Sequence, residues 1–253
     1  MQAQWQRQLE RDGYVELPAI FDATAVDRIT EELSAALASA AAEGSALCSE
    51  TGVLYAARNV LELWPRAASV WRVPRLFDAL RVALGPDFGL VRALYFDKPP
   101  GLSWTLPCHQ DVVIAVRDNR LPSERFTKPT RKAGVPHVEA PPEVLENMLT
   151  ARIHLDEVTD ENGPLRVVPG THRGGEPFTG EGVAARTLHA ARGDVLLMRP
   201  LLAHGSVKAA PDTVRHRRVL HLEFAASPAL ADGYAWHDFI AASNSTQIIA
   251  QAD

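Results

Sequence analysis

The short motif "HQD" combines two metal-capable side chains at a spacing of two residues. Its neighbours are rich in strand-forming residues, and a β-strand directs alternate side chains to opposite faces. His109 and Asp111 are therefore predicted to point the same way, with Gln110 pointing the opposite way. An imidazole and a carboxylate placed side by side can occupy two adjacent positions of a metal ion.

A third metal ligand must come from elsewhere in the chain, and His204 is the best-placed histidine downstream of His109. It follows the apolar segment "DVLLMRPLLA" and precedes a glycine and a serine. Two histidines and one carboxylate on one face of an iron(II) ion leave positions open for a bidentate co-substrate and dioxygen. An H-x-D triplet alone is a weak signal, so this interpretation depends on the surrounding sequence.

The segment "RRVLHLEFA" contains two arginines that could bind the distal carboxylate of 2-oxoglutarate. Arginine suits that task because its planar guanidinium donates two parallel hydrogen bonds. Alternation along a strand places Arg217 on one face with His221, and Arg218 on the other face with Leu220 and Phe224. Periodicity does not choose between the two arginines, and either is also consistent with an exposed position at a sheet edge.

Around these residues the sequence predicts a mainly β protein with flanking α-helices. Short strands separated by Gly, Pro, Asn and Asp follow residue 89, a pattern typical of an antiparallel sandwich or barrel. Apolar spacing predicts helices over residues 22–43 and 73–85, and residues 11–21 are expected to be extended. Residues 117–148 interrupt the strand pattern with a proline-rich, charged insertion that has no periodicity until a short helix near its end.

Composition excludes several classes of partner. A formal charge of -5 over 253 residues argues against a nucleic-acid-binding protein. No apolar run reaches transmembrane length, and the polar opening lacks the apolar core of a signal peptide, so no membrane association is expected. Two cysteines do not form a disulfide framework, which makes the cytoplasm the expected location. The expected partner is a small-molecule substrate, and the oligomeric state is not predicted.

Four segments occur in an order and at a spacing that resemble the phytanoyl-CoA dioxygenase (PhyH) family of iron(II)/2-oxoglutarate-dependent oxygenases. They are "HQD", "DENGPLRVVPGTHR", "RGDVLLMRPLLAHGS" and "RRVLHLEFA", and the opening "RDGYVELPAIF" is also similar. The resemblance implies a double-stranded β-helix, a cupin-like jelly roll with a metal at its open end. It implies one oxygenase domain over residues 1–253, divided as follows: a mostly helical part (1–88), a jelly-roll core (89–225) containing an insertion or lid (117–148), and a tail (226–253).

The resemblance also assigns roles to individual residues. The implied iron(II) ligands, which are the catalytic residues, are His109, Asp111 and His204. Arg217 is implied to bind the 2-oxoglutarate carboxylate, with help from the Ser206 hydroxyl and from Lys98. The loop between His204 and Arg217 is longer than in many members, so Arg218 stays an alternative.

These observations predict a non-haem iron(II)/2-oxoglutarate-dependent dioxygenase that uses O₂ to hydroxylate a small polar metabolite or a natural-product intermediate. A carboxylate at Asp111 favours hydroxylation, because related halogenases carry a small residue there. Arg152, which shares a strand face with His154, is expected to bind a substrate carboxylate or phosphate, unless it forms an internal ion pair. The alternative function is a cupin-like protein that binds a metal or small ligand without turnover, which has no use for Arg217 and Ser206.

Overall fold

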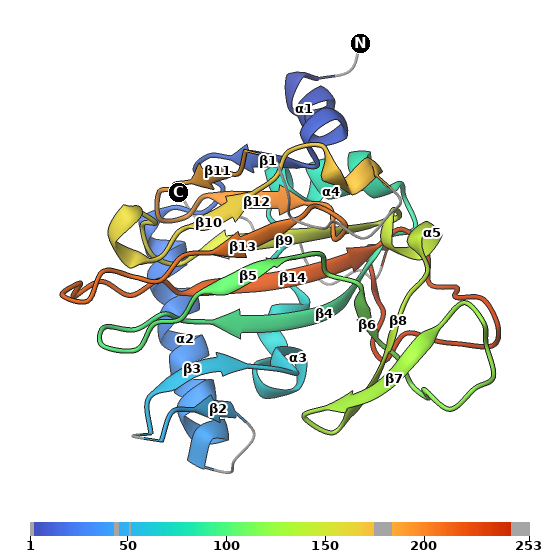
Figure 1. The fold of residues 1–253 in the computed structure, drawn as a ribbon, viewed down its shortest axis with the longest axis horizontal. Coiled ribbons are helices and arrows are strands. Elements are labelled where there is room, and N and C mark those ends of the chain that lie inside the picture. Colours follow the sequence, from blue (N-terminus) through green and yellow to red (C-terminus); the bar gives the residue numbers. More distant parts are fainter. Residues whose placement is uncertain (1–2, 43–45, 51, 175–183, 244–253) are drawn as a thin grey trace.

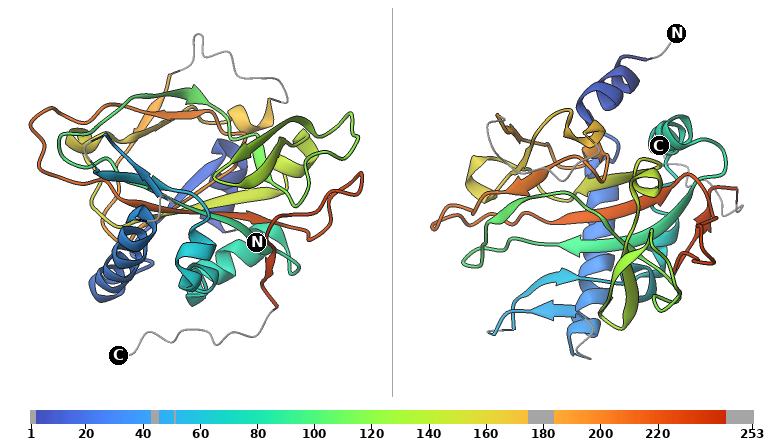
Figure 2. Two further views of the ribbon diagram at one scale, coloured as in Figure 1. Left: turned by 90° about the horizontal axis from the view of Figure 1, so that it is seen from below. Right: turned by 45° about the vertical axis from the view of Figure 1, so that its right-hand side comes forward.

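Two facing antiparallel sheets form the centre of the protein (Figures 1 and 2). The computed structural model describes residues 3–42, 46–50, 52–174 and 184–243. The larger sheet consists, in spatial order, of β1 (Tyr14–Leu17), β12 (Val195–Met198), β9 (Met148–His154), β14 (Val219–Ala225), β4 (Gly89–Phe96), β3 (Leu54–Ala57) and β2 (Ala46–Cys48), with β15 (Ile240–Ala241) also paired to β4.

The smaller sheet lies opposite, as the left view of Figure 2 shows. Its strands, in spatial order, are β11 (Arg186–Leu188), β10 (Leu165–Val167), β13 (His204–Ser206) and β5 (Leu106–His109). The chain passes from β4 in the larger sheet to β5 in the smaller one, returns to β9, crosses to β10 and β11, returns to β12, crosses to β13 and returns to β14. This winding is that of a double-stranded β-helix, and the predicted jelly-roll architecture is confirmed.

The insertion takes part in a small separate sheet. Its strands β7 (Thr127–Lys132) and β8 (Val135–Glu139) pair with each other, β8 also pairs with β6 (Val113–Ala115), which precedes the insertion, and the short helix α5 (Pro142–Leu145) follows. The expectation of an irregular segment was therefore wrong, apart from the short helix. A two-residue turn at Ala133 and Gly134, both with positive φ (46° and 81°), joins β7 to β8, as tight hairpins require. The ring of Phe126 packs 4.4 Å from that of Tyr234, which ties the insertion to the C-terminal segment.

Helices cover the outer face of the larger sheet (Figure 2, left). They are α2 (Ala23–Ala42), α3 (Val60–Leu63) and α4 (Pro74–Leu84). A further helix, α1 (Gln4–Asp12), precedes β1. Three 3₁₀ turns occupy Pro65–Ala68, Asp160–Asn162 and Thr171–Arg173. The predicted helices α2 and α4 are confirmed, whereas α1 was not predicted. The Asp22 carboxylate accepts a hydrogen bond from the Ala25 amide and caps α2, and Gly85 ends α4 at φ 89°. Among the described residues, no helix is long and apolar enough to span a membrane.

The alternation of side chains along β14 separates the core from the interior of the jelly roll. Leu220, Leu222 and Phe224 are fully buried against the helices, and the Phe224 ring packs 5.2 Å from that of Trp71. The residues between them point the other way, and among these His221 is buried and polar. One face of the strand therefore stabilises the fold by apolar burial, and the opposite face is free to carry polar chemistry.

Candidate metal centre

The three residues predicted as metal ligands converge at one point. One ligand atom from each of His109, Asp111 and His204 lies within 4.8 Å of the others. His109 Nε2 is 3.6 Å from Asp111 Oδ1, and His204 Nε2 is 3.5 Å from Asp111 Oδ2. The predicted clustering of these side chains is therefore present in the structure.

Strand pairing explains how the two histidines meet. His109 and His204 are directly opposite each other in the β5–β13 pair, and their ring centroids are 4.5 Å apart. Gly205 allows this approach, because a Cβ there would lie 2.6 Å from the Leu106 carbonyl oxygen. Asp111, however, does not share the strand of His109, since β5 ends at His109, and its amide instead donates to the Pro200 carbonyl at 2.9 Å. The prediction of one strand through both residues was wrong, although their side chains do converge.

Hydrogen bonds to the backbone fix the tautomers of both imidazoles. Nδ1 of His109 is 2.9 Å from the Pro107 carbonyl, and Nδ1 of His204 is 2.8 Å from the Leu202 carbonyl. Because a carbonyl only accepts, each Nδ1 carries the proton and each Nε2 presents a lone pair toward Asp111. This donor arrangement fits a divalent cation.

The ionisation states agree with that fit. Burial lowers the pKa of His204 to about 4, so its imidazole is neutral near pH 7. For Asp111, burial acts to raise the pKa, but the imidazoles of His204 and His109 outweigh it and hold the pKa below its usual value. The Asp111 carboxylate beside His109 favours its protonated form and raises the pKa of His109. A carboxylate anion between two imidazoles is a charge pattern that suits iron(II).

A cavity of about 510 Å³ adjoins these three residues and is lined by side chains of both sheets. Such a volume is typical of small-molecule sites. Arg152, Ser206 and Arg217 also line it. The cavity therefore brings the predicted ligands together with three of the residues predicted to bind the co-substrate or substrate.

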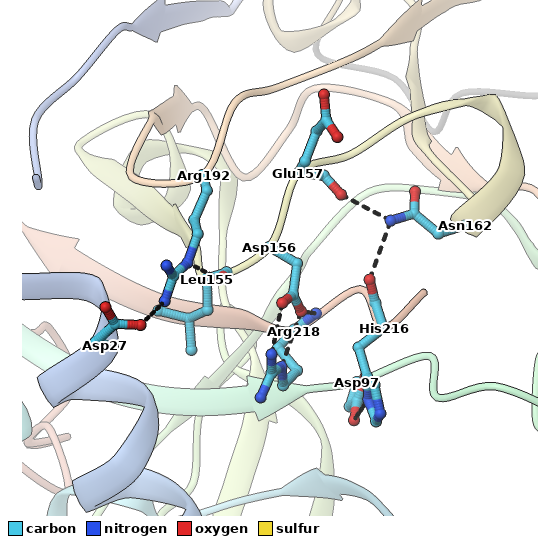
Figure 3. A network of polar contacts seen from close by, with 9 residues as sticks. All are labelled: Asp27, Asp97, Leu155, Asp156, Glu157, Asn162, Arg192, His216 and Arg218. Atoms are coloured by element: carbon cyan, nitrogen blue, oxygen red, sulfur yellow. Dashed lines mark hydrogen bonds and ion pairs between the residues drawn. The ribbon is translucent and has the colours of Figure 1, made fainter. Parts of the chain in front are cut away.

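The two neighbouring arginines have different surroundings. Arg217 is 5% exposed and lines the cavity, and its Nε has no hydrogen-bond partner among the described residues. Burial, followed by the nearby charge of Arg152, lowers the pKa of Arg217 to about 9. Arg218 lies on the opposite face and donates to both Asp156 carboxylate oxygens, at 2.9 and 2.6 Å (Figure 3). Arg217 is thus the arginine available to a ligand in the cavity.

Lys98 supports the cavity wall from behind Ser206. Its ammonium is fully buried and donates to Ser206 Oγ at 2.9 Å and to the Val207 carbonyl at 2.6 Å. Burial, and then the charges of Arg217 and Arg152, lower the pKa of Lys98 to about 7. Lys98 does not line the cavity itself.

The segment "DENGP" holds the loop that leads to Arg217. The Asn162 side-chain amide donates to the Glu157 carbonyl at 2.7 Å and to the His216 carbonyl at 3.0 Å (Figure 3). Its oxygen accepts from the Thr159 amide at 2.9 Å. These bonds hold His216, the residue directly before Arg217. They need a side chain that both donates and accepts hydrogen bonds, as an asparagine amide does.

Arg152 lies on β9 inside the cavity with no carboxylate within ion-pair distance among the described residues. Its Nη1 donates to His221 Nδ1 at 3.2 Å, and burial lowers its pKa to about 10, against the raising effect of Asp111. The internal ion pair considered from sequence is therefore not found in this part of the chain. His154, on the same face, is buried, and burial lowers its pKa to about 3.

The cavity also contains residues that sequence reasoning missed. They are Arg58, Arg92, Trp104, Lys132 and Glu223. Arg92 and Glu223 had a detectable signal, because each is a charged residue in a strand whose alternate positions are apolar. The other three come from loops and from the insertion, where no periodicity marks them.

Comparisons with known proteins agree with this architecture. The family profile of Phytanoyl-CoA dioxygenase (PhyH) matches residues 9–216. None of the curated protein sequences matches the chain.

Several solved structures are similar in fold. EctD from S. alaskensis with bound Fe has a TM-score of 0.67 at 21% identity, covering 89% of this chain and 76% of EctD. The epimerase SnoN in complex with Fe³⁺, alpha ketoglutarate and nogalamycin RO has a TM-score of 0.62 at 18% identity, covering 88% and 82%. The alpha ketoglutarate dependent carbocyclase SnoK from nogalamycin biosynthesis has a TM-score of 0.64 at 19% identity, covering 92% and 89%. At these identities the similarity concerns the fold.

Proposed function

The chain belongs to the phytanoyl-CoA dioxygenase family, whose members depend on iron(II), 2-oxoglutarate and O₂, and we propose that it hydroxylates a C–H bond of a small polar metabolite or natural-product intermediate. The observation that carries the proposal is the convergence of His109, Asp111 and His204 on a cavity that also receives Arg217, which forms no ion pair among the described residues. A metal-binding protein without turnover has no need for that buried, unpaired charge.

The proposed iron ligands are His109, Asp111 and His204. When bound there, iron(II) supplies the oxidising chemistry together with 2-oxoglutarate and O₂. The backbone hydrogen bonds to both Nδ1 atoms orient the two imidazoles before a metal arrives, so little rearrangement accompanies binding. Because Asp111 is ionised, the site already carries one of the negative charges that a divalent cation needs.

The proposed co-substrate site lies at Arg217 and Ser206. The guanidinium binds the distal carboxylate of 2-oxoglutarate with two parallel hydrogen bonds, and the Ser206 hydroxyl adds a third. Lys98 keeps that hydroxyl in place and adds a positive charge behind it. The burial of all three groups makes each interaction stronger than it would be in water.

Arg152 is the proposed substrate contact nearest the iron ligands. Its guanidinium is buried and lacks a carboxylate partner within ion-pair distance among the described residues, so a substrate carboxylate or phosphate would satisfy it. The proposed partner is a small molecule and neither a nucleic acid nor a membrane. The free state of Cys48 and Cys108 supports the cytoplasm as the proposed location.

An anaerobic titration tests the class of activity. Protein supplied with iron(II) and then with 2-oxoglutarate is expected to develop a weak visible charge-transfer band, because the co-substrate chelates through its 2-oxo acid. A screen of metabolite extracts for substrate-dependent succinate then identifies the reaction. If the band forms but no extract or purified metabolite raises succinate above the uncoupled background, the binding protein without turnover becomes the better description.

A further inference from the structure

Three basic side chains gather at the end of the cavity remote from Arg217. Arg92 lies on β4 opposite Glu223 of β14. Glu223 is six residues after Arg217, a separation of about 20 Å along an extended chain. Arg58 directly follows β3, and Lys132 ends β7 of the insertion. All three side chains line the cavity, although they come from segments far apart in the sequence.

The cluster contains more positive charge than its own carboxylate can neutralise. Arg92 pairs with Glu223 at 3.4 Å. Arg58 and Lys132 have no ion pair within the described part of the chain. Burial, followed by the charge of Arg92, lowers the pKa of Arg58, and burial followed by the charges of Arg58 and Arg92 lowers that of Lys132. These cations repel one another in the ligand-free protein.

A hydrogen bond holds the repelling segments together. The Asn59 side-chain amide, next to Arg58, donates to the carbonyl of Ala133, next to Lys132, at 2.9 Å. This bond keeps Arg58 and Lys132, which form no ion pair among the described residues, in neighbouring segments, an arrangement that a bound anion would stabilise.

The charge balance of the whole cavity leads to the same conclusion. Among the described residues, the cavity is lined by five basic side chains (Arg58, Arg92, Lys132, Arg152 and Arg217) and two carboxylates (Asp111 and Glu223). An iron(II) ion and a 2-oxoglutarate dianion cancel each other, so an excess of three positive charges remains after both have bound. Such an excess in a cavity attracts an anion.

We infer that the substrate carries an oxyanion, either a phosphate or a carboxylate, which binds between Arg58, Arg92 and Lys132. This inference rests on the proposed function, because it assigns the substrate of the same cavity. The anion at this end fixes one end of the substrate, and the rest extends along β14 toward the iron ligands. The insertion thereby contributes to specificity through Lys132.

Sulfate and acetate are suitable probes, because they represent a tetrahedral dianion and a carboxylate. Each is titrated calorimetrically into protein that already holds iron(II) and 2-oxoglutarate under argon. Arg58→Gln and Lys132→Gln are each expected to weaken binding of the preferred anion at least tenfold, as expected for loss of a charged hydrogen bond. Lys128→Gln is the control: Lys128 lies on the same strand, pairs with Glu139 and does not line this cavity.

Two results would overturn the inference: the absence of sulfate and acetate binding to the wild-type protein, or equal binding to Arg58→Gln, Lys132→Gln and the control. The charge-transfer band with 2-oxoglutarate is followed in every variant and should not change, which shows that the variants are folded. If the band forms neither in the wild type nor in any variant, the proposed function is refuted. The anion site is still supported in that case if anion binding depends on Arg58 and Lys132. In the succinate screen, turnover is expected from metabolites retained by an anion exchanger, and turnover from the unretained fraction alone would contradict the inference.

Discussion

Replacing Arg217 by glutamine should greatly weaken 2-oxoglutarate binding, whereas replacing Arg218 should not. The two arginines are adjacent and identical in chemistry, but they point to opposite faces of the strand. Arg217 faces the cavity with an Nε that has no hydrogen-bond partner in the described part of the chain, and Arg218 contacts both carboxylate oxygens of Asp156. They therefore form a matched pair in which only the surroundings differ.

The size of the effect follows from the hydrogen bonds at stake. A hydrogen bond to a charged group contributes about 1.5–3 kcal/mol, and arginine makes two parallel bonds to a carboxylate. Because glutamine retains one neutral donor, Arg217→Gln should lose about 2–4 kcal/mol of binding, which is roughly a 30- to 700-fold increase in Kd. Arg218→Gln removes a half-buried ion pair and should lower the free energy of unfolding by about 1 kcal/mol, with Kd nearly unchanged.

The assay is the anaerobic charge-transfer titration, with thermal unfolding measured for each variant. Arg217→Lys keeps the charge without the two-pronged geometry and should restore only part of the affinity. If Arg217→Gln bound 2-oxoglutarate as tightly as the wild type, the assignment of the cavity-facing arginine would be wrong. A loss confined to Arg218→Gln would show that the co-substrate binds on the other face.

Three further predictions concern the neighbouring residues. Asp111→Ala should abolish both iron retention and succinate formation, because it removes the only anionic ligand of the three; stoichiometric iron by metal analysis would contradict this. With a pKa of about 7, Lys98 is roughly one-tenth protonated at pH 8 and nine-tenths at pH 6. A carboxylate beside Ser206 raises that pKa, so binding of 2-oxoglutarate should take up nearly one proton at pH 8 and almost none at pH 6. Calorimetry in buffers of different ionisation enthalpy measures this uptake. Lys98→Met should remove it, and an equal uptake in that variant would exclude Lys98 as its source. Asn162→Ala breaks three hydrogen bonds and should lower the free energy of unfolding by about 2–4 kcal/mol and weaken 2-oxoglutarate binding, whereas Glu161→Ala, which alters an exposed side chain, should change neither.

The sequence allowed the jelly-roll strands to be predicted because turn residues separate short apolar runs. The insertion was misjudged for a physical reason. Almost every residue of β7 is exposed, so the strand has no apolar alternation to detect. Its extended conformation comes from pairing with β8 through the Ala133–Gly134 turn, and "AG" is a weaker turn signal than "NG" or "DG". α1 was missed for a similar reason, because Leu9 is the only apolar residue that it buries fully.

The clustering of the three candidate metal ligands was predictable from spacing and motif, but the reason for their convergence was not. A shared strand was assumed for His109 and Asp111, whereas tertiary contacts with the β12–β13 connection position Asp111. The choice between Arg217 and Arg218 depended on knowing which face of β14 packs against the helices. Arg58 and Lys132 lie near each other only through the pairing of the insertion with the segment after β3, which no local pattern encodes.

The buried cations in and behind the wall of this cavity should weaken the ligand-free protein and favour the binding of an anion. Burial lowers the pKa of Arg217, Arg152 and Lys98, which means that the fold disfavours each of these positive charges. No carboxylate pairs with them among the described residues, so an incoming anion relieves the penalty and its affinity includes that relief. In the proposed binding mode a dicarboxylate pairs with Arg217 and Ser206 at one end, with Lys98 behind Ser206, while its other end reaches toward the candidate iron ligands. We therefore expect the site to prefer a dianion before any substrate enters, because a neutral molecule of the same shape would leave the buried charges unpaired.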